Sequence, residues 1–313
     1  MRIALAVYLG ATLVLSMFQE WLIFPGQSTQ GRRDAIVPPM RNSDLVQLDT
    51  SHGDRITILF GKAMTAEGQI REDSSTRPSI IFFYGNAMSL ADAVGFCLEW
   101  RKLGANVVGV EYPGYGMSTG KPGEQAFYAA GDAAYEYLLA RGDINKTKII
   151  PTGLSIGTGV AVDLASRKPV GGLALFAAYT SLDDLARHNF AWLPTSKILR
   201  HHFNNEKKIA GLRIPILIVH GRHDSIIPVW MSERLEKAAT QAQVTRILVD
   251  TDHNDLFELA GDELNAAMSK LIEQVGAAPS PSPGTPGEGW GGGASRGAQP
   301  PPSPSPGVPG EGK

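Results

Sequence analysis

The segment Lys148–Arg167 reads KIIPTGLSIGTGVAVDLASR and predicts the fold more directly than any other part of the chain. Its first five residues form an apolar run typical of a buried strand, and the pattern of a helix begins at Ser155. Between them, Gly153–Gly157 matches Gly-x-Ser-x-Gly, a sharp strand-to-helix turn that exposes a serine hydroxyl at the edge of a parallel sheet. Glycine is needed on both sides because larger side chains would clash in so tight a turn. The segment therefore predicts Ser155 as a nucleophile.

The same five-residue pattern occurs a second time, at Gly116–Gly120 with Ser118 in its centre. This copy lies in PGYGMSTGKPGE, where no helix begins until after Pro122. A strand and a helix do not flank it, so we expect Ser118 to be a structural loop residue.

On either side of the first copy, short apolar runs alternate with longer helical patterns. Strands are expected at 45–49, 55–60, 79–83, 106–111, 148–152, 172–177, 214–219 and 244–249. Helices are expected at 90–102, 124–140, 155–167, 230–239 and 255–274. This alternation predicts an α/β fold with a mostly parallel eight-stranded sheet, helices on both faces and an antiparallel hairpin at one edge. The irregular stretch Tyr179–Gly211 is expected to form a small cap.

A serine hydroxyl is a weak nucleophile unless a base lies within hydrogen-bond reach. Asp224 follows the strand IPILIV within HGRHDSIIP, and His253 follows the last strand within DTDHNDL. Both residues are expected on loops at the sheet edge that carries Ser155, in the order serine, acid, histidine. We therefore predict His253 as the general base and Asp224 as the acid that orients it.

Other polar residues near these loops are assigned structural roles. We expect loop solvation or helix capping from Asp250, Asp252 and Asp255, and local structural contacts from His220 and His223. The pair His201–His202 lacks carboxylate or cysteine partners at ligand spacing, so no metal site is predicted. No cofactor is predicted either.

Acyl transfer passes through an oxyanion that backbone N–H groups stabilise. Ile156, directly after the predicted nucleophile and at the positive end of its helix, is expected to supply one donor. The second is expected from the loop Tyr84–Ser89, which follows the strand SIIFF. Within this loop Asn86 is the preferred donor and Ala87 the next.

Composition limits the classes of function. Hydrophobic residues make up 43% of the 313 residues, the formal net charge is −2, and Cys97 is the single cysteine. An internal disulfide is excluded, and the absence of a basic stripe argues against nucleic acid as a partner. Residues 277–313 are nearly all Pro, Gly and Ser and are predicted to be a disordered tail. The folded domain is expected over residues 40–275.

The N-terminus carries a targeting signal. An apolar run after Arg2, extended by Trp21–Phe24, reaches about 22 residues, which is enough to cross a bilayer. A cleaved signal peptide would need small residues where Met17–Glu20 stand. We therefore predict a single-pass signal anchor over residues 1–25. The folded domain that follows it in sequence is expected to be extracytoplasmic. A buried or amphipathic N-terminal helix is the remaining alternative.

With these residues in place, the chain resembles a known family, the small membrane-anchored α/β-hydrolases that include protein depalmitoylases, lysophospholipases and bacterial esterases. The resemblance rests on YGNA, EYPGYGMSTGKPGE, GLSIGTGVA, IPILIVHGRHDSIIP and HNDL. It implies the α/β-hydrolase fold and the triad Ser155, Asp224 and His253. The family usually has histidine at the position of Tyr84. A tyrosine there would either brace the loop, which we favour, or donate its hydroxyl to the oxyanion, as in prolyl-oligopeptidase-like enzymes.

We therefore expect a serine hydrolase that cleaves a carboxylic ester or thioester of a lipid or small acyl substrate through an acyl-enzyme. The membrane is expected as a partner through the N-terminal segment. A peptidase or aminopeptidase on the same fold is one alternative. A non-catalytic, membrane-tethered binding protein is the other.

Overall fold

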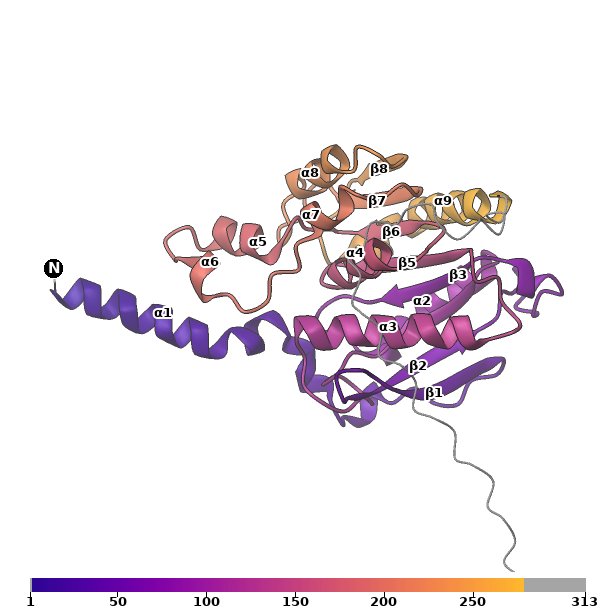
Figure 1. Cartoon of the computed structure of the whole chain (residues 1–313), viewed down its shortest axis with the longest axis horizontal. Helices are drawn as coiled ribbons and strands as arrows, with labels where there is room; N and C mark the ends of the chain where they lie inside the picture. The colour runs from indigo at the N-terminus through magenta and orange to yellow at the C-terminus, as the bar shows by residue number, and fades with distance from the viewer. Residues whose placement is uncertain (1, 279–313) are drawn as a thin grey trace, which may run out of the picture. The chain divides into compact units, whose positions relative to one another are not determined.

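The computed structural model describes residues 2–278, and an eight-stranded sheet with the order β1-β2-β4-β3-β5-β6-β7-β8 lies at its centre (Figure 1). The strands are β1 (Ser43–Asp49), β2 (Arg55–Gly61), β3 (Ser79–Phe83), β4 (Asn106–Val110), β5 (Ile149–Leu154), β6 (Leu173–Phe176), β7 (Ile216–Gly221) and β8 (Val244–Val249). From β4 to β8 all neighbours pair in parallel. The predicted eight-stranded, mostly parallel sheet is confirmed.

The antiparallel edge is larger than a hairpin. β1 pairs with β2, as expected, and β2 pairs antiparallel with β4 as well. The connecting turn is closed by the Thr50 N–H, which donates to the Asp54 carbonyl at 2.8 Å, and Gly53 supplies the left-handed backbone there with φ +91°.

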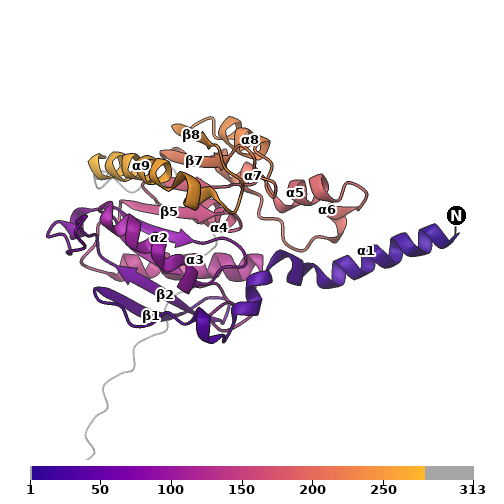
Figure 2. The same cartoon turned by 180° about the vertical axis from the view of Figure 1, so that it is seen from behind.

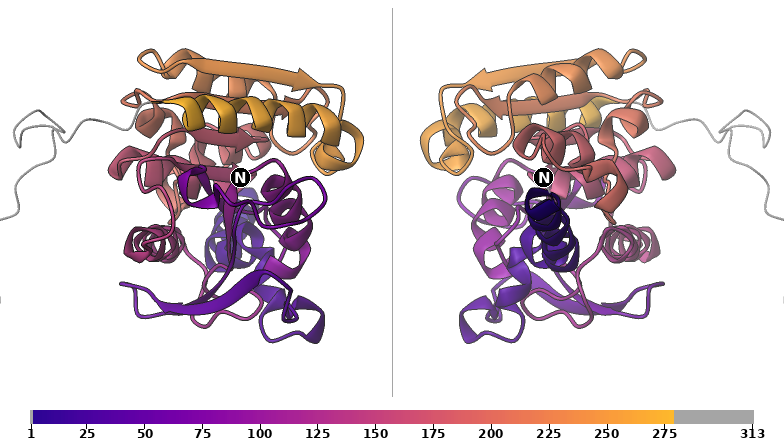
Figure 3. Two further views of the ribbon diagram at one scale, coloured as in Figure 1. Left: turned by 90° about the vertical axis from the view of Figure 1, so that its right-hand side faces the viewer. Right: turned by 90° about the vertical axis from the view of Figure 1, so that its left-hand side faces the viewer.

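Helices cover both faces of the sheet (Figures 2 and 3). One face carries α2 (Leu90–Lys102) and α9 (Leu256–Ala277), which contact each other. The other face carries α3 (Glu124–Ala140), α4 (Gly157–Arg167) and α8 (Trp230–Ala238). The central strands β3 and β4 are buried on both faces, so they are continuous apolar runs rather than alternating patterns.

The irregular stretch between β6 and β7 contains three short helices, α5 (Leu182–Asn189), α6 (Thr195–Ile198) and α7 (Asn205–Ile209). Ser181 caps α5 by accepting a hydrogen bond from the Asp184 N–H, and Asn204 caps α7 in the same way. In Figure 1, α5 and α6 lie apart from the sheet and form the small cap that the sequence predicts.

The N-terminal segment forms the helix α1 (Arg2–Ile23), and the 3-10 helices η1 (Pro25–Thr29) and η2 (Arg33–Ala35) follow it. A third 3-10 helix, η3 (Ser74–Thr76), precedes β3. None of the helices formed by residues 2–278 combines the length and apolar character that a bilayer crossing requires. The anchor predicted over residues 1–25 stays a prediction. Beyond residue 278, the predicted tail lies outside the described residues.

Candidate active site

Ser155 occupies the turn between β5 and α4 with φ +51°, a left-handed conformation that is strained for a residue with a side chain. The two glycines of the motif are sterically required. A Cβ on Gly153 would lie 2.5 Å from the Gly157 carbonyl oxygen, and a Cβ on Gly157 would lie 2.0 Å from that of Phe83. The local sequence therefore fixes a tight turn that presents the Ser155 hydroxyl at the sheet edge.

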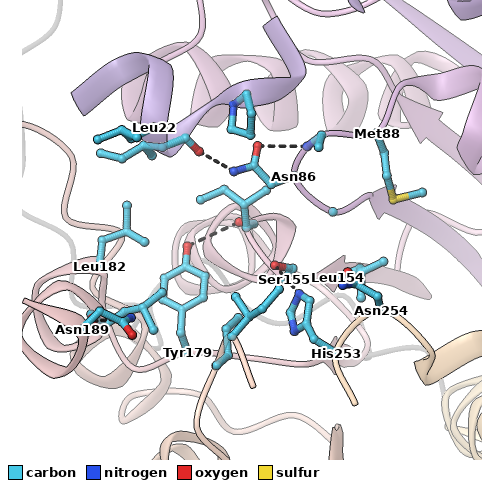
Figure 4. A pocket seen from close by; sticks show the side chains of 18 of the residues that line it. Leu22, Asn86, Met88, Leu154, Ser155, Tyr179, Leu182, Asn189, His253 and Asn254 are labelled. Carbon is cyan, nitrogen blue, oxygen red and sulfur yellow. Dashed lines mark hydrogen bonds between the residues drawn. The ribbon is translucent and has the colours of Figure 1, made fainter. Parts of the chain in front are cut away.

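Three side chains from three loops meet at this edge. His253 Nε2 lies 3.1 Å from Ser155 Oγ, and His253 Nδ1 lies 2.8 Å from Asp224 Oδ2 (Figure 4 shows Ser155 and His253). The other carboxylate oxygen, Oδ1, accepts the N–H groups of Ile226 and Ile227 at 3.0 and 2.7 Å. The structure thus brings together the three residues predicted from sequence.

The charge state of Asp224 decides the proton positions. Burial raises the pKa of its carboxyl, but the hydrogen bonds from His220 and His253 outweigh burial and hold the pKa below its ordinary value. An ionised carboxylate only accepts hydrogen bonds, so His253 carries its proton on Nδ1. Nε2 is therefore free to accept the Ser155 hydroxyl proton.

Contacts between the loops after β7 and β8 fix the distance from Asp224 to His253. Asp252 accepts the N–H and hydroxyl of Ser225 at 2.8 and 2.9 Å, and His223 Nε2 lies 2.7 Å from Asp250. Solvation and capping alone were expected of Asp250 and Asp252, but both residues also cross-link the two loops. Asp255 precedes α9, but its side chain makes no cap hydrogen bond.

The two predicted oxyanion donors, Ile156 and Asn86, line the same cavity as Ser155. Ile156 precedes the first turn of α4, and Asn86 lies in the loop after β3. Within residues 2–278, neither N–H donates to a protein acceptor, whereas the Ala87 N–H donates to Asn86 Oδ1 at 3.2 Å. Of the predicted donors, Ile156 and Asn86 are thus available and Ala87 is engaged.

Tyr84 is fully buried, and its hydroxyl donates to Glu111 Oε1 in a short hydrogen bond. The same oxygen accepts the Leu90 N–H at 3.0 Å, at the start of α2. Burial raises the pKa of Glu111 to about 7, although the hydrogen bonds from Tyr84 and the backbone act in the opposite direction. Tyr84 is not among the residues that line the cavity at Ser155, so its placement supports the bracing role.

The cavity at Ser155 has a volume of about 690 Å³. Its walls are mostly apolar. Besides the Ser155 turn, they come from the end of α1 with Pro25, the loop after β3 with α2, the cap, and the loops after β7 and β8 (Figure 4). The lining includes Leu22 and Ile23 of α1, Phe96 of α2, and Leu185 and Phe190 of the cap. Among the described lining residues there is no Asp, Glu, Lys or Arg.

Ser118 lies elsewhere and is 3% exposed. Its hydroxyl donates to the Glu111 carbonyl at 3.2 Å and accepts the Thr57 N–H at 3.0 Å. These contacts close the loop against β2, as expected for a structural residue.

The remaining histidines take part in separate contacts. His201 Nδ1 accepts the Glu124 N–H at 3.3 Å, and its ring packs edge-on against Phe24 with centroids 5.0 Å apart. His202 Nδ1 lies 2.7 Å from Asp183. The His201 contacts join the cap to the start of α3 and to the residue after α1, whereas the His202 contact lies within the cap.

His220 is fully buried with Nε2 3.4 Å from Asp224 Oδ2, in keeping with the local structural role expected of it near the acid loop. Sequence reasoning missed two other contacts at this site. Glu111 was not singled out, since a carboxylate at a strand end gives no signal of burial by itself. The contact between the Asn86 side chain and Ile23 joins residues 63 positions apart, so no local pattern predicts it.

No protein-family model matches the chain. It is 32% identical over 266 residues to the alpha/beta hydrolase domain-containing protein 17B of Xenopus laevis, a match that covers 84% of this chain and 83% of that protein. It is also 27% identical over 264 residues to an uncharacterized protein of Mycobacterium tuberculosis, with 84% and 90% covered.

Solved structures show the same fold. An alpha-beta hydrolase from Vibrio vulnificus matches with a TM-score of 0.63 at 20% identity, over 81% of this chain and 93% of that one. An esterase of Pyrococcus furiosus matches with a TM-score of 0.62 at 17% identity, over 76% and 97%. At such identities the likeness shows the fold alone.

Proposed function

Because the chain belongs to the family of α/β-hydrolase domain-containing proteins, we propose that it is a serine hydrolase. It cleaves a carboxylic ester or thioester through an acyl-enzyme on Ser155. One observation carries this proposal: the hydrogen-bonded row Ser155–His253–Asp224 opens into an apolar cavity.

The geometry supports the following sequence of steps. Ser155 Oγ attacks the acyl carbonyl while His253 Nε2 takes its proton, and Asp224 stabilises the resulting imidazolium. The N–H groups of Ile156 and Asn86 stabilise the oxyanion. Collapse expels the alcohol or thiol, which leaves with the proton from His253. Water then attacks the acyl carbonyl while His253 takes its proton. His253 returns the proton to Ser155 Oγ as the carboxylic acid leaves.

The cavity favours an acyl chain over a peptide. An aminopeptidase needs carboxylates for the substrate's amino group. The cap offers Asp183, Asp184 and Glu206, and Glu206 is paired with Arg234. Asp183 is paired with His202, and Asp184 accepts the Thr180 hydroxyl at 2.9 Å. The apolar walls instead suit a hydrocarbon chain, which gains roughly 0.8 kcal/mol per buried CH₂.

Labelling with a fluorophosphonate probe, followed by hydrolysis of an ester series of increasing acyl length, tests the proposal. We expect covalent labelling that disappears in Ser155→Ala and persists in Ser118→Ala, with kcat/KM rising as the chain lengthens. Labelling that survives in Ser155→Ala would contradict the assignment. A preference for peptide over ester substrates would favour the peptidase instead.

We further propose that the enzyme acts at a lipid surface. α1 exposes a large set of apolar side chains: Leu9, Leu13, Val14, Met17, Phe18, Trp21 and Leu22. The cap adds exposed Phe190 and Trp192, and Tyr8 of α1 contacts Trp192. Leu22 and Phe190 also line the cavity, so the exposed apolar surface continues into the site.

Flotation with phosphatidylcholine vesicles tests this second proposal. We expect the protein to float with the vesicles and a Leu13→Glu, Phe18→Glu variant to stay below. Leu259→Glu is the matched control, since Leu259 on α9 is 67% exposed and Leu13 is 61% exposed. Equal flotation of all three proteins would contradict it. The extracytoplasmic placement stays a prediction, which protease protection of intact cells would test.

A further inference from the structure

We propose that the end of α1 is a positioning element of the active site, and that the Asn86 side chain transmits its position to the oxyanion loop. The inference rests on the proposed hydrolase function. It assigns to the N-terminal helix a role in catalysis that is separate from contact with lipid.

The Asn86 amide bridges two elements that are distant in sequence. Its Nδ2 donates a short hydrogen bond to the carbonyl of Ile23, the last residue of α1. Its Oδ1 accepts the Tyr115 hydroxyl at 2.9 Å. The last four carbonyls of a helix lack partners within the helix, so Asn86 caps α1 from the oxyanion loop (Figure 4).

The end of α1 is held rigidly by buried contacts. Phe24 is fully buried, with ring centroids 5.1 Å from Phe127 and 5.0 Å from His201. Gly26 lies directly on the Tyr115 ring, because a Cβ there would come within 2.1 Å of Tyr115 Cε2. Ile23 and Tyr115 therefore act as two fixed points for the Asn86 amide.

The amide in turn holds the loop backbone. Ala87 has φ +62°, a conformation that is unfavourable for alanine. Asn86 Oδ1 accepts the Ala87 N–H at 3.2 Å and stabilises this conformation. The side chain that makes this contact belongs to the residue whose own N–H is the proposed oxyanion donor. Without the bridge, we expect this N–H to lose its fixed orientation towards the oxyanion.

Kinetics of an acetyl ester test the inference, because so short a chain does not depend on the cavity walls. Asn86→Asp keeps Oδ1 and replaces the donor to Ile23 with an oxygen. We expect kcat to fall on the order of 100-fold with KM changed less than threefold, as for loss of an oxyanion donor. Tyr115→Phe, which removes one hydroxyl, should lower kcat by about tenfold.

The matched control is Gln19→Ala. Gln19 joins α1 to the cap through the Ile198 carbonyl at 3.0 Å and the Arg200 N–H at 2.8 Å, without touching Asn86. Its kcat should stay within twofold of the unaltered chain. A similar loss of kcat in Gln19→Ala would overturn the inference, because any loosening of α1 would then suffice.

Ser155→Ala separates the two levels of the proposal. If this variant retains turnover, the proposed function fails. If it is inactive while Asn86→Asp and Tyr115→Phe keep their kcat, only the positioning role fails. Thermal midpoints of all variants show whether they are folded. Deletion of residues 1–18 leaves Gln19–Pro25 in place and should preserve kcat on the acetyl ester.

Discussion

The two Gly-x-Ser-x-Gly segments of this chain share a pattern and differ in everything around it. Ser155 stands at a strand-to-helix turn with φ +51° and has His253 at 3.1 Å. Ser118 lies in a loop, 3% exposed, with its hydroxyl engaged by the backbone of Glu111 and Thr57. A motif thus acquires chemistry only where the flanking elements leave the hydroxyl free and bring a base to it.

The largest expected effect separates the two serines. Ser155→Ala should lower kcat by about a million-fold, because the nucleophile is removed. Ser118→Ala should leave kcat within threefold. Steady-state hydrolysis of a short acyl ester by both variants is the measurement. The reverse ranking would exchange the roles of the two segments.

A smaller loss of kcat is expected when Asp224 can no longer orient His253 towards Ser155. Asp224→Asn preserves shape but lets an amide N–H face His253 Nδ1, which favours the wrong tautomer. We expect kcat to fall by about 10⁴-fold with KM nearly unchanged. The pH–rate profile between pH 5 and 9 is the check, and a loss below tenfold would show that Asp224 is dispensable.

Tyr84→Phe tests the loop that faces Ser155. The phenol donates to Glu111, so its loss should cost less than about tenfold in kcat, or roughly 1.4 kcal/mol. Tyr84→His would restore the residue that the resembling family usually has. A several-hundred-fold fall in kcat for Tyr84→Phe at unchanged thermal midpoint would instead place the hydroxyl on the oxyanion.

Glu111 joins the loop after β3 to the segment around Ser118, since its carboxylate accepts from Tyr84 and its carbonyl accepts from Ser118. Burial raises its pKa from 4.5 to about 7, so the folded protein retains a proton that the unfolded chain releases. Stability should therefore fall as pH rises from about 4.5 to 7, by roughly 3 kcal/mol at most.

Thermal midpoints of Glu111→Gln against pH test this expectation. The midpoint of the unaltered chain should decline across the window relative to that of Glu111→Gln by several degrees. Exposed Glu258, replaced by Gln, is the control and should follow the unaltered chain. Parallel curves for all three proteins would show that Glu111 does not titrate there.

A further effect concerns the stability of Ser118→Ala. Its hydroxyl satisfies the Thr57 N–H in a buried setting, so its loss should destabilise the fold by about 1–3 kcal/mol while activity persists. Urea unfolding measures this. A midpoint equal to that of the unaltered chain would mean that another group takes over the Thr57 N–H.

Much of this arrangement could be predicted because its signals are local. The strand at 79–83 and the helices at 90–102 and 124–140 have the predicted bounds, since apolar periodicity and turn residues define them. The helix expected from Ser155 begins at Gly157, because the strained turn occupies Ser155 and Ile156.

What escaped prediction depends on distant contacts. The Glu111 carboxylate beside Tyr84 and Ile23 beside Asn86 arise from tertiary packing, which periodicity does not record. The antiparallel pairing of β2 with β4 is of the same kind, because it joins strands that are not consecutive.

The burial of Phe24 has a consequence for biosynthesis. Its partners Phe127 and Phe203 are synthesised long after it, and Phe203 follows Phe24 by 179 residues. At ribosomal rates on the order of 5–20 residues per second, Phe203 is synthesised roughly 10–35 s after Phe24. During that interval the apolar side chains of the nascent N-terminus are uncovered, and exposed apolar surface of this kind makes incomplete chains prone to association.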